Sequence, residues 1–217
     1  MAGAPRPPAP AADGRAAARL VAALAESGCP VCACLEADAR RDLAAFLREQ
    51  TMDPVGRAAL RQAGGFCAWH TGLLREAADG ILSVVLVAEE LVRSAWPARP
   101  ACPACAGLAD RQAAYLAAPR EAAVRPALRE ALERGPGLPC RPHLRAAAAP
   151  EPLVSGRVER LAAALGGFIA KQDYRSGMPP SPEEARAWSE ALEHLAGRPR
   201  LFGSDLARAV DGSAAPR

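Results

Sequence analysis

The sequence predicts an all-α fold: a tandem duplicated helical bundle with two zinc knuckle sites, each built from a C-x2-C and a C-x2-H. Three observations support this fold. Apolar residues recur at helical spacing in most segments between turns. No segment alternates apolar and polar residues for long enough to predict a strand. A pattern of three cysteines and one histidine occurs twice in the 217 residues.

The two patterns share one spacing. CPVC at 29–32 returns as CPAC at 102–105, and CAWH at 67–70 returns as CRPH at 140–143. Every one of these positions therefore recurs 73 residues later, and each copy reads C-x2-C-x34-C-x2-H. We interpret this register as an internal duplication, with a first helical zinc-binding repeat over 15–97 and a second over 98–175.

Four helices are predicted in the first copy. Leu35 and Leu43 lie on one apolar face of the first of them. Asp53 followed by Pro54 is typical of the start of the second, and the Gly64-Gly65 pair ends it. The four helices span about 34–50, 54–63, 67–79 and 81–96.

The second copy and the C-terminal segment are also predicted to be helical. In the second copy, helices are expected over 107–118, 121–135 and 158–172, and Pro126 should kink or restart the middle one. Ser181 and Pro182 predict the start of a C-terminal helix within 176–202 that packs on the repeats. Three large apolar residues share one face of that helix: Trp188, Leu192 and Leu195.

The two ends of the chain are predicted to be poorly ordered. Residues 1–14 are rich in Pro and Ala and lack the apolar core of a signal peptide, which indicates a disordered leader. Residues 203–217 read as a weakly ordered tail. The longest apolar run, 81–88, is too short to span a bilayer. We therefore expect a soluble, cytoplasmic protein with no membrane contact, in which cysteines serve as metal ligands or catalytic thiols rather than as disulfides.

Three thiolates and one imidazole form a donor set typical of structural zinc. The sequence predicts two zinc ions per chain, and an iron–sulfur cluster is the weaker alternative. Covalent haem needs C-x-x-C-H and is excluded, because Ala33 and Ala106 follow the second cysteines. The predicted ligands are Cys29, Cys32, Cys67, His70, Cys102, Cys105, Cys140 and His143.

The sequence leaves the pairing of the knuckles open. We expect each repeat to close its own site, because a single ancestral copy would have had to do so. One site would then join 29–32 to 67–70, and the other would join 102–105 to 140–143. A crossed arrangement, in which each C-x2-C meets the C-x2-H of the other repeat, stays possible.

Two further residues of metal-binding type lie off the template. Cys34 is two residues past the first knuckle, but its counterpart is Gly107, so we predict that it is not a ligand. It could instead be a reactive thiol beside the site. His194, on the last helix, has no partner at metal-ligand spacing and is predicted to lie on the surface.

The chain resembles an uncharacterised family of bacterial and archaeal helical proteins with duplicated CPxC…CxxH metal-binding units and a KxDYR tail. The resemblance covers roughly residues 26–197 and rests on the two CPxC knuckles, GGFCAWH and KQDYR. The second knuckle departs from the family pattern, because LPCRPH replaces an aromatic-bearing GFCxxH. The resemblance implies a metal-bound helical fold and supplies no reaction.

The sequence favours a zinc-stabilised helical scaffold or adaptor with an unknown protein partner. Closed four-ligand sites leave no position for a substrate water, and no catalytic residue is assigned. The alternative is a redox- or metal-responsive regulator that uses zinc-bound thiolates. A metal-dependent enzyme using Asp173, Tyr174 and Arg175 is the weakest reading, and no small-molecule substrate is indicated. The 27 basic and 24 acidic residues are interspersed, which argues against nucleic-acid binding.

Overall fold

All the regular structure in the described part of the chain is helical, as the sequence predicts. The computed structural model describes residues 14–76, 81–94, 102–147, 152–173, 175, 177–198 and 201. In chain order the elements are α1 (Gly14–Leu24), α2 (Pro30–Glu49), α3 (Pro54–Gln62), α4 (Ala68–Glu76), α5 (Ile81–Arg93), α6 (Pro103–Ala117), the short 3-10 helix η2 (Ala118–Glu121), α7 (Pro126–Arg134), α8 (Arg141–Ala147), α9 (Pro152–Lys171) and α10 (Pro182–Ala196).

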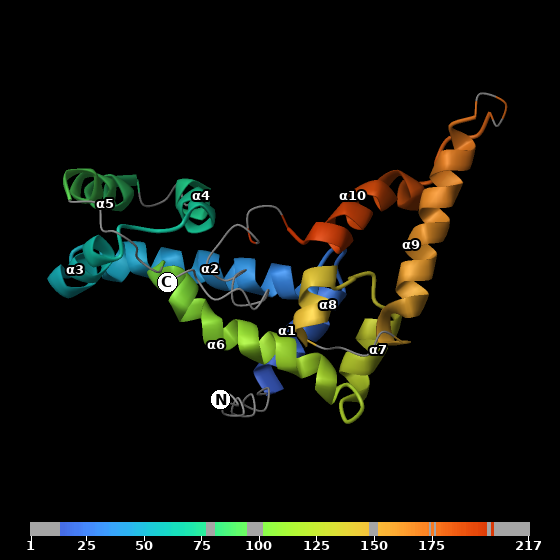
Figure 1. The fold of residues 1–217 in the computed structure, drawn as a ribbon, viewed down its shortest axis with the longest axis horizontal. Coiled ribbons are helices and arrows are strands. Elements are labelled where there is room, and N and C mark those ends of the chain that lie inside the picture. Colours follow the sequence, from blue (N-terminus) through green and yellow to red (C-terminus); the bar gives the residue numbers. More distant parts are fainter. Residues whose placement is uncertain are drawn as a thin grey trace, which may run out of the picture.

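Two long helices, α2 and α6, form the centre of the fold and run antiparallel (Figure 1). Asp42 of α2 pairs with Arg111 of α6, and one turn earlier the Asp38 carboxylate accepts a 2.8 Å hydrogen bond from the Tyr115 hydroxyl. The start of each helix therefore lies beside the end of the other. This arrangement decides which cysteines can meet.

The main core fills the space between α1, α2, α6 and α7. Leu20, Leu35, Leu108 and Leu128 are almost completely buried there. Because many of the surrounding side chains are Ala, this core buries less apolar area for each residue than a core built from larger side chains. Interactions other than apolar packing are therefore important for the stability of this core.

One charged side chain lies inside this core. The carboxylate of Asp38 is fully buried. It forms ion pairs with Arg19 of α1, with Arg41 of α2 at 2.7 Å and with Arg111 of α6 at 3.5 Å. Since a buried charge is tolerated only when it is paired, this cluster fixes how α1 and α6 sit on α2.

Groups of helices extend from both ends of the α2–α6 pair (Figure 1). The helices α3, α4 and α5 gather at the C-terminal end of α2. At the opposite end, α8, α9 and α10 surround a second, smaller core that includes Leu138, Val154, Leu161 and Ala187. The molecule is elongated as a result.

Several local predictions are confirmed. Asp53 caps α3 by accepting hydrogen bonds from the next two backbone N–H groups after Pro54. Pro126 is the first residue of α7 and follows a break after η2. Ser181 and Glu184 form a reciprocal capping box at the start of α10. The helix α1 was not predicted from the sequence.

The C-terminal helix packs through a different face from its most apolar one. Ala187 is buried against α9, with Ala191 beside it. Trp188, Leu192 and Leu195 do share a face, but these three residues are 57%, 58% and 48% exposed. Apolar patches of this kind are characteristic of binding surfaces.

Some predictions fall outside the described residues. These include the leader except Gly14, which opens α1, and the tail over 203–217. Tyr174 also lies outside them. Among the described helices, none combines the length and the apolar character needed to cross a bilayer.

Candidate metal centres

The four knuckles share one local structure. Each begins with a cysteine directly before the first residue of a helix, and the second ligand is the third residue of that helix. Pro30 and Pro103 occupy the first helical position of the two C-x2-C knuckles, where a missing N–H costs nothing. Each knuckle therefore presents its donor atoms at a helix N-terminus, where the helix dipole favours thiolates.

The first site combines the N-termini of α2 and α8. Its members are Cys29, Cys32, Cys140 and His143, and all four are buried. The Nδ1 atom of His143 lies 3.5 Å from the Sγ atoms of Cys29 and Cys32, and 3.2 Å from that of Cys140. The Sγ atoms of Cys32 and Cys140 are 3.9 Å apart.

The second site combines the N-termini of α4 and α6. Its members are Cys67, His70, Cys102 and Cys105. The Nδ1 atom of His70 lies 3.3 Å from the Sγ atom of Cys67, and 3.5 Å from those of Cys102 and Cys105. Cys67 and Cys105 approach to 3.7 Å between their Sγ atoms. In each site all four donor atoms lie within 4.8 Å of one another, so each could hold one metal ion.

The expected pairing within each repeat is wrong, because the sites are crossed. Each C-x2-C meets the C-x2-H from the other half of the chain. The cause is helix length at a rise of about 1.5 Å per residue. The 20 residues of α2 carry the chain about 30 Å from Cys29, and the nine residues of α3 return it by only about 14 Å. The second C-x2-C, at the start of antiparallel α6, is already at that end of α2.

The backbone also holds the crossed first site in place. The carbonyl of Gly28 accepts a 3.0 Å hydrogen bond from Leu138, and the N–H of Gly137 donates to Leu24 at 3.0 Å. A β-carbon on Gly137 would lie 2.9 Å from backbone atoms of Leu24 and Glu26, so only glycine allows this approach. These bonds place the loop before Cys29 next to the loop before Cys140.

Crowded thiols divide their protons unevenly in each site. Burial opposes ionisation of Cys29, but hydrogen bonds from Cys140 and Cys32 lower the pKa of its thiol well below the usual value. Hydrogen bonds to Cys140 and Cys29 raise the pKa of Cys32. In the second site the pKa of Cys67 is lowered and that of Cys105 is raised, again by hydrogen bonds among the thiols. One thiolate forms easily, and further ones need a compensating cation.

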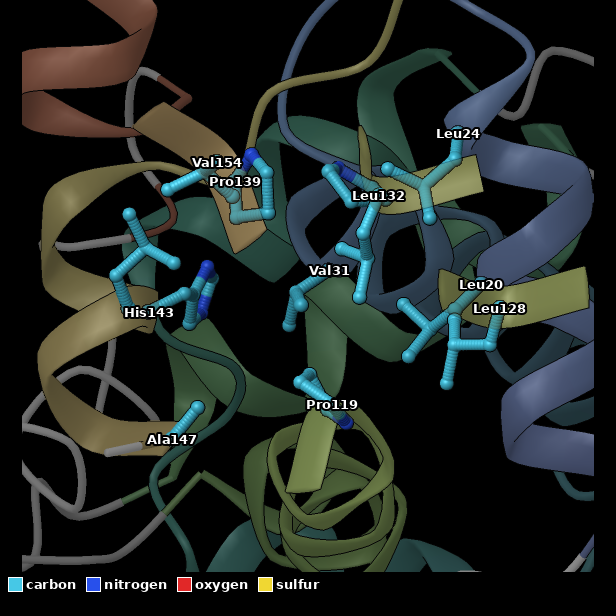
Figure 2. A pocket seen from close by; sticks show the side chains of 12 residues that line it. Leu20, Leu24, Val31, Pro119, Leu128, Leu132, Pro139, His143, Ala147 and Val154 are labelled. Atoms are coloured by element: carbon cyan, nitrogen blue, oxygen red, sulfur yellow. The ribbon is translucent and has the colours of Figure 1, made fainter. Parts of the chain in front are cut away.

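The two sites differ in their surroundings. Cys67 is only partly buried, whereas its three companions and all the residues of the first site are buried. An apolar pocket borders the first site, where the imidazole of His143 faces Leu20, Val31 and Leu128 (Figure 2). This lining keeps water away from that side of the first site.

Residues of the C-terminal helix support the first site from outside. Glu193 accepts a 2.8 Å hydrogen bond from the backbone N–H of Cys29. His194, predicted to lie on the surface, is in fact buried, and its Nδ1 donates to the carbonyl of Pro139 at 2.9 Å. The prediction was wrong because the fold places α10 against α8, and no local pattern reports that contact. Neither supporting role was predicted from the sequence.

Cys34 belongs to neither site, as predicted from its glycine counterpart. Its side chain is buried, and its thiol donates to the carbonyl oxygen of Arg19 at 3.7 Å. Burial raises the pKa of this thiol to about 11. Cys34 is therefore a packed thiol, which argues against a role as a reactive neighbour of the metal.

The other residues considered for chemistry lie elsewhere. Asp173 and Arg175 are exposed beyond the end of α9, where the Asp173 carboxylate accepts a 2.9 Å hydrogen bond from the backbone of Arg175. This end of α9 projects away from α8, which carries His143 (Figure 1). The contact is a local turn and not part of either metal site.

Comparisons with known proteins found no matching protein family, no matching curated protein and no matching solved structure. The family resemblance of the CPxC and GFCxxH motifs therefore stays a prediction. Conclusions about function rest on the two sites themselves.

Proposed function

We propose that the protein is a zinc-stabilised helical scaffold or adaptor that holds two zinc ions. The observation that carries the proposal is the convergence of three thiols and one imidazole at each of two sites. Four protein donors fill the tetrahedral coordination that zinc prefers in structural sites, which leaves no position for a reacting water. Because the protein fills every coordination position, we infer that the zinc ions stabilise the structure.

The distances between donor atoms support a single tetrahedral ion. With Zn–S near 2.3 Å and Zn–N near 2.05 Å, an ideal tetrahedron has edges of about 3.8 Å between sulfurs and about 3.6 Å between sulfur and nitrogen. The corresponding distances are 3.9 Å and 3.5 Å between Cys32 and its neighbours Cys140 and His143, and 3.7 Å and 3.5 Å between Cys105 and its neighbours Cys67 and His70. An iron–sulfur cluster places bridging sulfides between several irons and spreads its ligands further apart, so it fits less well.

Metal content tests this proposal directly. Elemental analysis of protein purified without chelator should give about two zinc ions per chain, and X-ray absorption should report three sulfurs and one nitrogen around each. Cys34→Ala provides the matched control, because it removes a buried thiol next to the first site but no ligand. Iron with visible charge-transfer bands, or metal-free protein of unchanged helicity, would contradict the proposal.

A metal-responsive regulator remains the second candidate, and it now depends on Cys67. The packed environment of Cys34 removes the feature that had favoured it. Cys67, however, is a partly exposed ligand of the second site. If that site senses oxidants, peroxide should release one zinc ion of the two, and a reductant with zinc should restore it. Simultaneous loss of both ions would argue against such a sensor.

A further inference from the structure

The helix α5 exposes an apolar stripe. Ile81, Val85, Ala88 and Val92 follow one another at spacings of four, three and four residues, and therefore share one face. Their exposure is high: 75% for Ile81, 55% for Val85 and 86% for Val92, with Ala88 exposed as well. Only Val87 is buried among the residues of α5. Such a face on a surface helix is typical of a protein interface.

The corresponding stripe in the second half of the chain is covered. In the 73-residue register of the metal ligands, the counterparts of the α5 stripe are Val154, Val158, Leu161 and Leu165 of α9. Val154 and Leu161 are 6% and 5% exposed, and the other two are partly buried. The cover includes Ala187 and Ala191 of α10, which pack in the same cluster. Among the described helices, none covers α5 in the same way.

The helix α10 carries a second apolar face that is not used within the described chain. Trp188, Leu192 and Leu195 lie on it, about half exposed, while Ala187 is turned towards α9. Ion pairs from Arg157 to Glu190 and from Lys171 to Glu184 fasten α10 to α9, so this outer face is held in a fixed orientation. The described residues therefore leave two apolar helix faces largely uncovered.

We propose that these two faces bind each other between two copies of the chain, so that α5 of each copy packs against the outer face of α10 in the second copy. The helices α5 and α10 lie towards opposite ends of one long side of the molecule (Figure 1). A two-fold axis beside that side brings each α5 to the other copy's α10 and closes the assembly at two chains.

A dimer accounts for both faces better than a single foreign helix does. A stable interface buries about 800 Å² on each partner, which is more than one helix face supplies. The two-fold arrangement forms the α5–α10 contact twice and so doubles the area. It also places an α10 helix over the α5 stripe, as α10 already lies over the α9 stripe within one chain. Neither the dimer nor its test depends on which metal is bound.

Oligomeric state tests the proposal. Light scattering and sedimentation equilibrium on the full metal-loaded chain should show a dimer. Val85→Arg in α5 and Leu192→Arg in α10 should each weaken the dimer by at least about tenfold, because each buries a charge in the contact. Val124→Arg is the matched control, since Val124 is 78% exposed and lies outside both helices. Circular dichroism and metal content verify folding, and a wild-type chain that stays monomeric overturns the proposal.

Cross-linking identifies the contact. A chain with Val85→Cys and a differently tagged chain with Leu192→Cys are mixed and treated with a short bismaleimide, with the wild-type chain as the background. A product joining the two tags, well above the background, is expected. A dimer in which Val85→Cys links only to itself would show α5 against α5, and a dimer with no product above background would place the interface elsewhere. Either of these results overturns the assignment.

Discussion

The two candidate metal sites contain the same donors but join the chain over very different distances. Between the knuckles of the first site, the sulfur and nitrogen atoms in contact belong to residues 108 to 114 positions apart, across most of the fold. Between the knuckles of the second site the separation is 32 to 38 positions. Loop-closure entropy grows with the logarithm of loop length, so the first link restricts the unfolded chain by about 1 kcal/mol more. Identical ligand sets can therefore contribute unequally to stability.

Their neighbours differ as well. The first site is fully buried and is supported by Glu193 and His194 of α10. The second lies beside α4 and α5, where α5 buries only Val87 and Cys67 is partly exposed. Segments with few buried apolar contacts open at low free-energy cost. We therefore expect that metal bound at the first site would hold the whole fold together, whereas metal at the second would hold mainly the helices at the far end of α2.

Removing one ligand from each site gives the largest expected difference. Cys32→Ala should lose one zinc ion and lower the free energy of unfolding by about 4 kcal/mol. Cys105→Ala should also lose one ion, but cost about 1 kcal/mol less because it releases a shorter loop. Urea titration with elemental analysis measures both. A larger loss of stability from Cys105→Ala would reverse the ranking of the two sites.

The buried carboxylate of Asp38 lies between the two sites, and its loss should weaken both of them equally. Asp38 holds α2 against α6, and Asp38→Asn is expected to cost about 2–3 kcal/mol at pH 7 because its arginine partners lose their counter-charge. Burial alone would raise the pKa of Asp38, but hydrogen bonds from Arg19 and Tyr115 bring it below the usual value. A carboxylate with a lowered folded-state pKa stabilises above pH of about 4, and this stabilisation is lost as the pH falls through the folded pKa.

The difference between wild type and Asp38→Asn should therefore shrink in acid. Urea titrations of both proteins at neutral and acidic pH measure this difference, and the comparison cancels the effects of acid on the metal ligands that the two proteins share. If Asp38→Asn released only one zinc ion at pH 7, Asp38 would support one metal site and not the alignment of α2 with α6 on which both sites depend.

The order of metal release should distinguish the sites kinetically. A chelator or a thiol reagent should remove zinc from the second site first, by about tenfold in rate, because Cys67 is accessible and α5 opens easily. Stopped-flow detection of zinc should show two phases of equal amplitude. Cys105→Ala should delete the fast phase and leave the slow one. A single phase, or loss of the slow phase in that variant, would contradict the difference in accessibility.

The smallest effect is expected at Cys34. Cys34→Ala should keep both zinc ions and change the free energy of unfolding by about 1 kcal/mol or less, since only a packed thiol and one weak hydrogen bond are lost. Elemental analysis and urea titration give both numbers. Loss of an ion would mean that Cys34 is a ligand and that the first site is not the one described.

The sequence predicted the donors because their positions depend on local structure. A cysteine before a helix and a second ligand at the third helical residue can be recognised from C-x-x-C, C-x-x-H and the prolines at 30 and 103. The all-α fold and the caps at Asp53 and Ser181 have equally local causes. These features could be predicted because the short stretches of sequence that indicate them also cause them.

The pairing depended on contacts between distant residues, and the prediction failed there. No local pattern marks the pairing of Asp42 with Arg111 or the hydrogen bond from Leu138 to Gly28. One signal was nevertheless present, because a helix of nine residues returns the chain over only about half the length of a helix of about 20 residues. The burial of His194 and the exposure of Trp188 likewise depend on where α10 packs.

The crossed sites have a consequence for how such a chain could arise. Either half, cut from the other near residue 98, would carry a C-x2-C and a C-x2-H that belong to different sites in this fold, and so would hold only half of each site. Two separate halves could complete both sites only by exchanging knuckles as a pair of chains. If the 73-residue register records a gene duplication, joining the copies turned an assembly that depends on protein concentration into a folding reaction that does not.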